Sequence, residues 1–302
     1  MAIDTTKPSY WLNWRFLLCA LYVLATVVIA SIVIWKYEGK TRLHDEMREG
    51  QQVPVGFLYQ DEVWTTCVEG IHPSWLLSFR ILAFLLLMSL IVANSIIDGP
   101  GIFFFYTQWT FLLTTIFFGL ASAFSIYGCW YHGGACLKGA QNIDEEQSSC
   151  PAPELGGSMV YLLQIIYQVT AGAVVLTDVV WWVIIYPFLT AKDYKLSFFD
   201  TCMHSVNALV LVDALLNGMR YPMFRIAYFL LWTTLFVICQ WIIHACVSIP
   251  WPYPFMELSS SFAPLWYLGV GLLHIPCYGL FAVIVKLKHM WLLDPFQTPI
   301  RV

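Results

Sequence analysis

Seven long apolar runs dominate this sequence and leave few folds open to it. Their approximate limits are 16–35, 75–97, 102–128, 159–187, 199–217, 226–248 and 264–285. A helix of about 20 residues crosses the roughly 30 Å hydrocarbon core of a bilayer. The runs are continuous rather than alternating, and backbone amides must be satisfied within lipid, so helices are predicted in place of barrel strands. We therefore expect an all-α, polytopic transmembrane helical bundle of seven spans.

Composition supports this class. Of 302 residues, 59% are hydrophobic and 11% charged, and the mean hydropathy is +0.69, which excludes a soluble globular protein. The net charge of -4, without any basic run, argues against nucleic acid as a partner. Nine scattered cysteines do not form a secreted disulfide framework. The expected partners are membrane lipids or solutes that cross a bilayer, and no cofactor is predicted.

The runs divide the chain into three parts. Residues 1–74 are expected to form an anchor helix and a charged loop, residues 75–289 a six-helix membrane core, and residues 290–302 a tail. The first run is too long for a signal peptide and lacks a small-residue cleavage site, which favours a retained anchor. Only residues 98–101 separate the second and third runs, so these spans should form a tight hairpin.

Lysine and arginine are unevenly distributed between the two sets of loops. Eleven lie on the first, third and fifth loops and the C-terminal segment, with Arg80 counted in the first loop, whereas four lie on the opposite set. The positive-inside rule then predicts a cytosolic C-terminus and a lumenal or outside N-terminus. The expected location is a multi-pass position in the endoplasmic reticulum or the plasma membrane.

A cysteine-containing segment, 129–158, is expected to be the third loop. Cys129, His132, Cys136 and Cys150 supply ligand types that zinc prefers. No CxxC pair is present, however, and the interpretation that we favour is a loop with unpaired thiols and no metal.

Ionisable residues inside the apolar runs are few: Asp178, His204, Asp213, His244 and His274. Each costs about 2.5–3.5 kcal/mol on insertion scales and is by default a candidate for function. Asp213 lies nine residues after His204, so on a continuous helix it faces the opposite side and cannot orient that ring. His274 is near mid-membrane and is interpreted as a packing histidine.

Because successive spans cross the membrane in opposite directions, alternate loops lie on the same surface, and this places three polar residues at one depth. His204 and His244 each lie about five residues from the same membrane surface, roughly 8 Å deep, and Thr107 falls at that level too. A neutral imidazole can take the proton of a hydroxyl and so activate it for attack on a lipid ester. Asp178 could reach a histidine through water or simply hold helices together, and Asn207 shares a helix face with His204.

Other polar residues near these positions have simpler interpretations. Thr110 and Thr114 share the helix face of Thr107, and we expect their hydroxyls to bond back to the preceding turn. Trp251 and Tyr253 are interpreted as part of an interfacial aromatic belt.

Three segments resemble the androgen-induced and Rolling stone-like family of multi-pass membrane proteins: 105–119, 203–213 and 244–255. The first contains Thr107 and ends in Phe-Phe-Gly. The second has His, Asn and Asp on one predicted helix, and the third has an aromatic-Tyr-Pro-Phe turn after a histidine-bearing span. The resemblance covers about 40 residues, and it assigns the second to seventh spans to the six-helix core of the family.

The resemblance also implies a chemistry. In the androgen-induced branch, the matched threonine and histidine form the catalytic pair of a hydrolase that cleaves fatty acid esters of hydroxy fatty acids. This implies Thr107 as nucleophile and His204 as general base, with His244 or a backbone amide stabilising the oxyanion. Trp109 and Asn207 bring the chain nearer to the Rolling stone branch, which is associated with myoblast fusion.

Two alternatives therefore stay open. The first is a non-enzymatic membrane protein for adhesion, fusion or scaffolding, in which the polar residues only lock helices together. The second is a metal-dependent hydrolase with His204, His244 and His274 as ligands, although His274 is deeper than the other two.

Overall fold

The computed structural model describes residues 4–38, 60–68, 71–141, 157–190 and 192–292, apart from the side chains of residues 60–61, 131–141 and 292. Within these residues, seven helices are long and apolar enough to cross a membrane, which confirms the predicted all-α, multi-pass class. The spans are α2 (Trp14–Glu38), α4 (Pro73–Ile97), α5 (Tyr106–Gln141), α6 (Ser158–Val179) continued by η3 (Val180–Leu189), α7 (Phe198–Met203) with α8 (Leu209–Leu216), α9 (Ile226–Cys246) and α10 (Ala263–Leu292).

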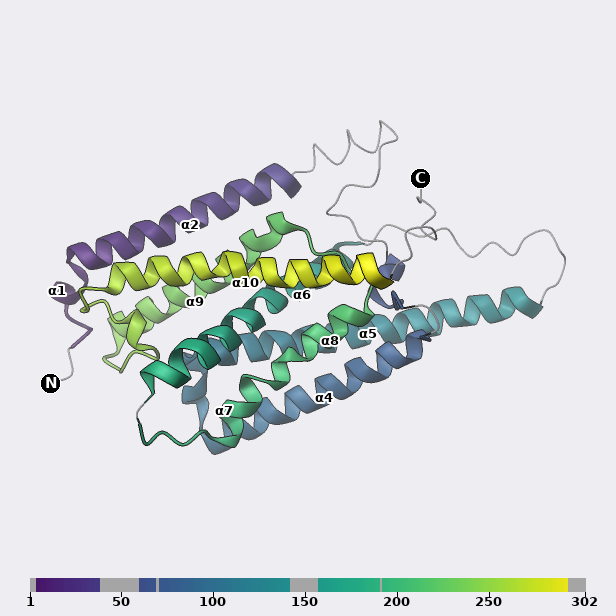
Figure 1. Cartoon of the computed structure of the whole chain (residues 1–302), viewed down its shortest axis with the longest axis horizontal. Helices are drawn as coiled ribbons and strands as arrows, with labels where there is room; N and C mark the ends of the chain where they lie inside the picture. The colour runs from purple at the N-terminus through teal and green to yellow at the C-terminus, as the bar shows by residue number, and fades with distance from the viewer. Residues whose placement is uncertain (1–3, 39–59, 69–70, 142–156, 191, 293–302) are drawn as a thin grey trace.

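The helices run side by side along one long axis (Figure 1). Helices α4 and α5 form the predicted hairpin, joined through the short η2 (Pro100–Phe104). Gly99 has φ +78° at this turn, a conformation that costs glycine little. Helix α6 packs against α5, α9 and α10 and so lies at the centre of the bundle, while α2 covers α9 and α10.

Two neighbouring spans depart from regular helix. The fifth span stops at Met203 and resumes as η4 (Val206–Ala208) and α8, so His204 lies at a break rather than inside a continuous helix. The fourth span widens from α6 into η3, a π-helix that contains Pro187. Irregular backbone at membrane depth is tolerated where protein covers it or where it lines a cavity. The continuous helices expected for both spans are therefore corrected.

Helix α5 is longer than expected. It continues to Gln141, so Cys129 lies on a helix and not in a loop, and its thiol is free. The side chains of His132 and Cys136, and all of Cys150, fall outside the described residues. Among the residues that are described, no group of three or more His, Cys, Asp or Glu could hold a metal ion.

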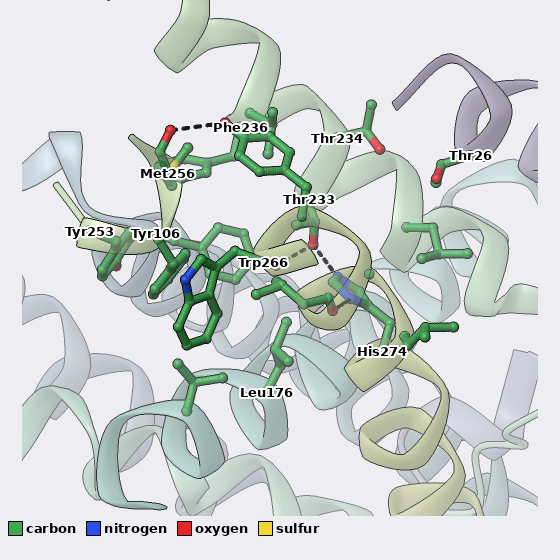
Figure 2. A pocket seen from close by; sticks show the side chains of 18 of the residues that line it. Thr26, Tyr106, Leu176, Thr233, Thr234, Phe236, Tyr253, Met256, Trp266 and His274 are labelled. Carbon is green, nitrogen blue, oxygen red and sulfur yellow. Dashed lines mark hydrogen bonds between the residues drawn. The ribbon is translucent and has the colours of Figure 1, made fainter. Parts of the chain in front are cut away.

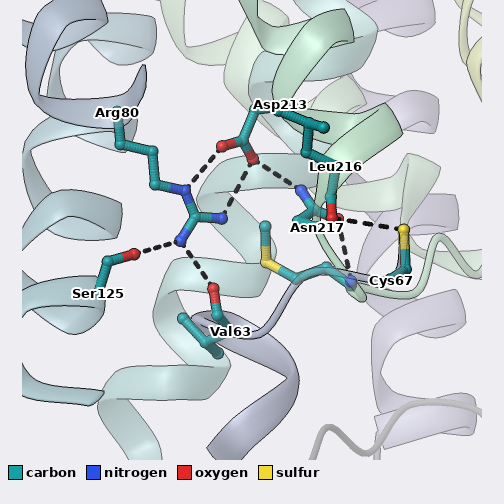
Figure 3. Close-up of polar contacts among 8 residues, drawn as sticks. Val63, Cys67, Arg80, Ser125, Asp213, Leu216 and Asn217 are labelled. Atoms are coloured by element: carbon teal, nitrogen blue, oxygen red, sulfur yellow. Dashed lines mark hydrogen bonds and ion pairs between the residues drawn. The ribbon is translucent and has the colours of Figure 1, made fainter. Parts of the chain in front are cut away.

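Arg80 is not a loop residue. It lies on α4, fully buried, and its Nε donates to Asp213 Oδ1 at 2.7 Å while Nη2 donates to Oδ2 at 3.3 Å (Figure 3). Its Nη1 donates to Val63 O and to Ser125 Oγ, both at 2.7 Å. The count of cations on the first, third and fifth loops and the C-terminal segment is therefore ten, and the excess over the four on the opposite set persists.

The C-terminal end of α8 completes this polar group. Asn217 Nδ2 donates to Asp213 Oδ2 at 2.7 Å, and Lys288 Nζ donates to Ala214 O and Asn217 O at 2.8 and 2.7 Å. A cation at the C-terminal carbonyls of a helix is stabilised by the helix dipole. We call Arg80, Ser125, Asp213, Asn217 and Lys288 the paired cluster.

Helix α2 is fixed to the bundle at both ends. At its C-terminal end, Arg225 Nε donates to Glu38 Oε1 at 2.6 Å, and the hydroxyls of Tyr161 and Tyr228 donate to Glu38 Oε2. Before its N-terminal end, Thr5 Oγ1 donates to His244 O at 2.8 Å. These bonds hold the middle of α2 over α9 and α10, which are themselves mainly apolar.

Candidate functional site

A cavity of about 440 Å³ lies between α2, α5, α6 with η3, α9, α10 and the loop after α9 (Figure 2). Its surface is mostly apolar and aromatic. Thr107 and His204 both line it, from the start of α5 and from the break in the fifth span. The two residues predicted to form a catalytic pair therefore face one shared chamber.

Thr107 is the second residue of α5 and is mostly buried. Its Oγ1 lies 3.5 Å from Tyr253 Oη, and its backbone N–H donates to the same oxygen at 3.4 Å. Burial raises the pKa of Tyr253, so this phenol stays protonated at neutral pH. No hydrogen bond joins Thr107 to His204 in the described structure.

His204 is oriented by residues of the neighbouring span. Its ring stacks on Trp181 with centroids 4.5 Å apart and planes at 2°, and its Nδ1 is 3.8 Å from Asp178 Oδ1. Asp178 Oδ1 also accepts a 2.9 Å hydrogen bond from Asn207 Nδ2. Asp178, His204 and Asn207, three of the predicted residues, are thus brought together.

The two irregular spans support each other at this point. The break after Met203 frees the His204 carbonyl, which accepts a 2.8 Å hydrogen bond from Trp182 Nε1. Trp181 and Trp182 are consecutive residues of η3. The ring of Trp181 stacks on the ring of His204, and the indole N–H of Trp182 donates to its carbonyl. A buried carbonyl without a partner costs free energy comparable to a lost hydrogen bond, so the π-helix and the break stabilise each other.

His244 is not brought to this group. It does not line the cavity, its ring stacks on Trp251 at 3.7 Å, and its Nδ1–H donates to Gln240 O at 2.8 Å. The structure therefore places His244 outside the group that contains Thr107 and His204. Tyr253 stands beside Thr107 instead, a contact that an interfacial-belt interpretation missed because it depends on how the loop folds.

Thr114 Oγ1 donates to Thr110 O at 2.8 Å, which confirms back-bonding for Thr114. Asp213 does not orient His204, as expected, and its partner is Arg80, which the sequence analysis did not predict. The three histidines of the metal hypothesis do not gather within the described part of the chain.

Comparison with protein-family models, curated proteins and solved structures finds no match for this chain. The resemblance to the androgen-induced and Rolling stone-like family thus stays a prediction.

Proposed function

We propose that this protein is an integral-membrane lipid esterase that hydrolyses fatty acid esters within the cavity. The observation that carries the proposal is that Thr107 and His204, from different spans, line one mostly apolar chamber. A site of this kind suits a lipid whose acyl chains remain in the membrane while its ester reaches the polar residues. The substrate class is the one implied by the family resemblance.

In this proposal Thr107 Oγ1 attacks the ester carbonyl, and His204 takes the hydroxyl proton and gives it to the leaving alcohol. Asp178 near the ring favours the imidazolium that forms, and Asn207 holds Asp178. Tyr253, kept neutral by its raised pKa, donates to the developing oxyanion beside Thr107. A water oxygen then bonds to the acyl carbon while His204 takes a water proton, the bond to Thr107 Oγ1 breaks, and that proton returns to Thr107, which releases the fatty acid.

The proposed orientation has a cytosolic C-terminus and a lumenal or outside N-terminus. The support for it is the excess of cationic residues on the first, third and fifth loops. Thr107 and His204 would then lie near the lumenal or outer surface, and a lipid of that leaflet is the expected substrate.

The test is site-resolved labelling of the full chain with a long-chain alkyl fluorophosphonate, followed by mass spectrometry of the labelled peptides. We expect an adduct on Thr107 in the wild-type protein, its loss in Thr107→Ala, and a large loss in His204→Ala. Thr114→Ala is a matched control, because this hydroxyl lies on the same helix and bonds to Thr110 O. An unlabelled Thr107, together with no lipid turnover, would favour the non-enzymatic alternative.

A further inference from the structure

A second hydroxyl–imidazole pair lines the same cavity, deeper than the first. Thr233 Oγ1 lies 2.8 Å from His274 Nε2, with Thr233 on α9 and His274 on α10 (Figure 2). Thr233 is thirteen residues before the end of α9 and His274 eleven after the start of α10, which is roughly 20 Å and 17 Å along the helices. The pair is therefore near mid-membrane.

The directions of the hydrogen bonds follow from the carbonyl that holds the ring. His274 Nδ1 lies 2.9 Å from Val270 O, and a carbonyl only accepts, so Nδ1 carries the proton. In a neutral imidazole Nε2 is then the acceptor, and Thr233 donates its hydroxyl proton to it. Tyr106 Oη lies 2.8 Å from Thr233 Oγ1 and must donate, because the only proton of Thr233 is already used.

This series of hydrogen bonds contains the groups that an activated nucleophile needs. A hydroxyl donates to a base, and a third group fixes the tautomer and orientation of the base. The ring of His274 is also held by Phe229, with centroids 4.4 Å apart. Tyr106, Thr233 and His274 all line the cavity, so a ligand there can reach the hydroxyl.

We propose that Thr233 and His274 form a second nucleophile–base pair, which takes an acyl ester of a lipid in the same cavity. Thr233 Oγ1 bonds to the ester carbonyl carbon while its proton moves to His274 Nε2. The carbon–oxygen bond to the alcohol then breaks, and the alcohol leaves with that proton. Tyr106, whose donor bond to Thr233 weakens as the new bond forms, turns to the carbonyl oxygen.

The acyl-threonine is resolved by water. The water oxygen bonds to the carbonyl carbon, one water proton passes to His274 Nε2, and the bond to Thr233 Oγ1 breaks. The proton on His274 then returns to Thr233, so the pair is restored. This inference shares the lipid ester substrate of the proposed function but depends on neither Thr107 nor His204.

The chain contains its own control for reactivity. Thr234 is adjacent to Thr233 and lines the same cavity, and Thr26 on α2 lines it as well, but neither bonds to a histidine in the described structure. Access alone would label all three hydroxyls, whereas activation by His274 would label Thr233 selectively.

The experiment uses the full chain in phosphatidylcholine proteoliposomes with the alkyl fluorophosphonate. In the labelling reaction an oxygen–phosphorus bond forms at Thr233, fluoride leaves and the proton goes to His274. Fragment spectra should place an adduct on Thr233 and none on Thr234 or Thr26. His274→Gln should slow the reaction about a hundredfold or more, and Thr233→Ser should keep it.

Each outcome separates the two proposals. An adduct on Thr107 without one on Thr233 supports the proposed function and overturns this inference, and an adduct on Thr233 alone does the reverse. A Thr233 adduct whose rate His274→Gln leaves unchanged in folded protein also overturns the inference. Wild-type mapping decides the main point even where a variant fails to fold.

Discussion

The two ends of the bundle differ in how completely their buried polar groups are paired. In the paired cluster, the side chains of Arg80 and Asp213 are fully buried and neutralise each other, with further bonds to Ser125 and Asn217. The cavity group comprises Thr107, Asp178, His204 and Asn207, and here the side-chain contacts of Thr107 and His204 are longer. Thr107 Oγ1 is 3.5 Å from Tyr253 Oη. Among the described residues, the Nδ1 of His204 has no hydrogen-bond partner, and it lies 3.8 Å from Asp178 Oδ1.

This difference separates structural from chemical roles. A buried charge that is fully paired is a fixed part of the packing. Removing one partner leaves the other charge unpaired in a low-dielectric interior. A polar group that lines a cavity and keeps bonding capacity can interact with a ligand. Buried charge alone is therefore a poor guide to a site in this protein.

The largest effect is expected at Arg80. Arg80→Ala leaves Asp213 buried without its cation, and the expected loss is about 3–5 kcal/mol in the free energy of unfolding. Thermal unfolding of detergent-purified protein measures it. The double variant Arg80→Met with Asp213→Leu should recover much of the loss, and a double variant as unstable as the single one would contradict the pairing argument.

Asp178→Asn should lower the rate at which Thr107 is labelled by about tenfold to a hundredfold, because it removes the negative charge 3.8 Å from the ring that takes the hydroxyl proton. Labelling kinetics measure this effect. The unfolding temperature should change far less than in Arg80→Ala. A large loss of stability with an unchanged labelling rate would show that Asp178 has a structural role, like the residues of the paired cluster.

Trp182→Phe tests the join between the two irregular spans. It leaves the His204 carbonyl without its donor, and we expect a loss of about 1–3 kcal/mol in stability. Thermal unfolding gives the magnitude. Trp109→Phe is a suitable comparison, since that indole donates to Phe103 O at the exposed end of η2 and should matter less. Equal losses would show that the break does not depend on Trp182.

The smallest effect is expected at Tyr253. Tyr253→Phe removes the hydroxyl beside Thr107 but keeps the ring, and the labelling rate of Thr107 should fall about tenfold or less. Because burial raises the pKa of Tyr253, the wild-type rate should show no loss from its ionisation as pH rises from 7 to 9. A Tyr253→Phe rate equal to wild type would remove Tyr253 from the mechanism.

The sequence predicts the spans well because hydropathy depends on composition alone. It also predicts that Thr107 and His204 lie at the same depth, because each is about five residues from a loop on the same membrane surface. Arg80 was missed since a charge near the end of an apolar run resembles a loop residue, although Asp213 in another run was a signal for a buried partner. Before a charged residue near the end of a span is counted as a loop residue, the other spans should be searched for a buried partner of opposite charge.

The break at His204 had no comparable signal. Neither glycine nor proline lies between Phe198 and Leu216, and the freed carbonyl is satisfied by Trp182, a partner from another span. His274 was interpreted as a packing histidine, and only the packing of α9 against α10 brings it to Thr233. Such contacts depend on tertiary structure that periodicity does not encode.

The position of α2 has a consequence for biosynthesis. This helix is made before α9 and α10, yet it packs on both, and Arg225 donates a hydrogen bond to Glu38 at its C-terminal end. Chains emerge from the ribosome N-terminus first, so α2 must remain in the bilayer without these contacts until α9 and α10 are inserted. Residues of all three helices line the cavity, so the cavity can be completed only after α10 has been made.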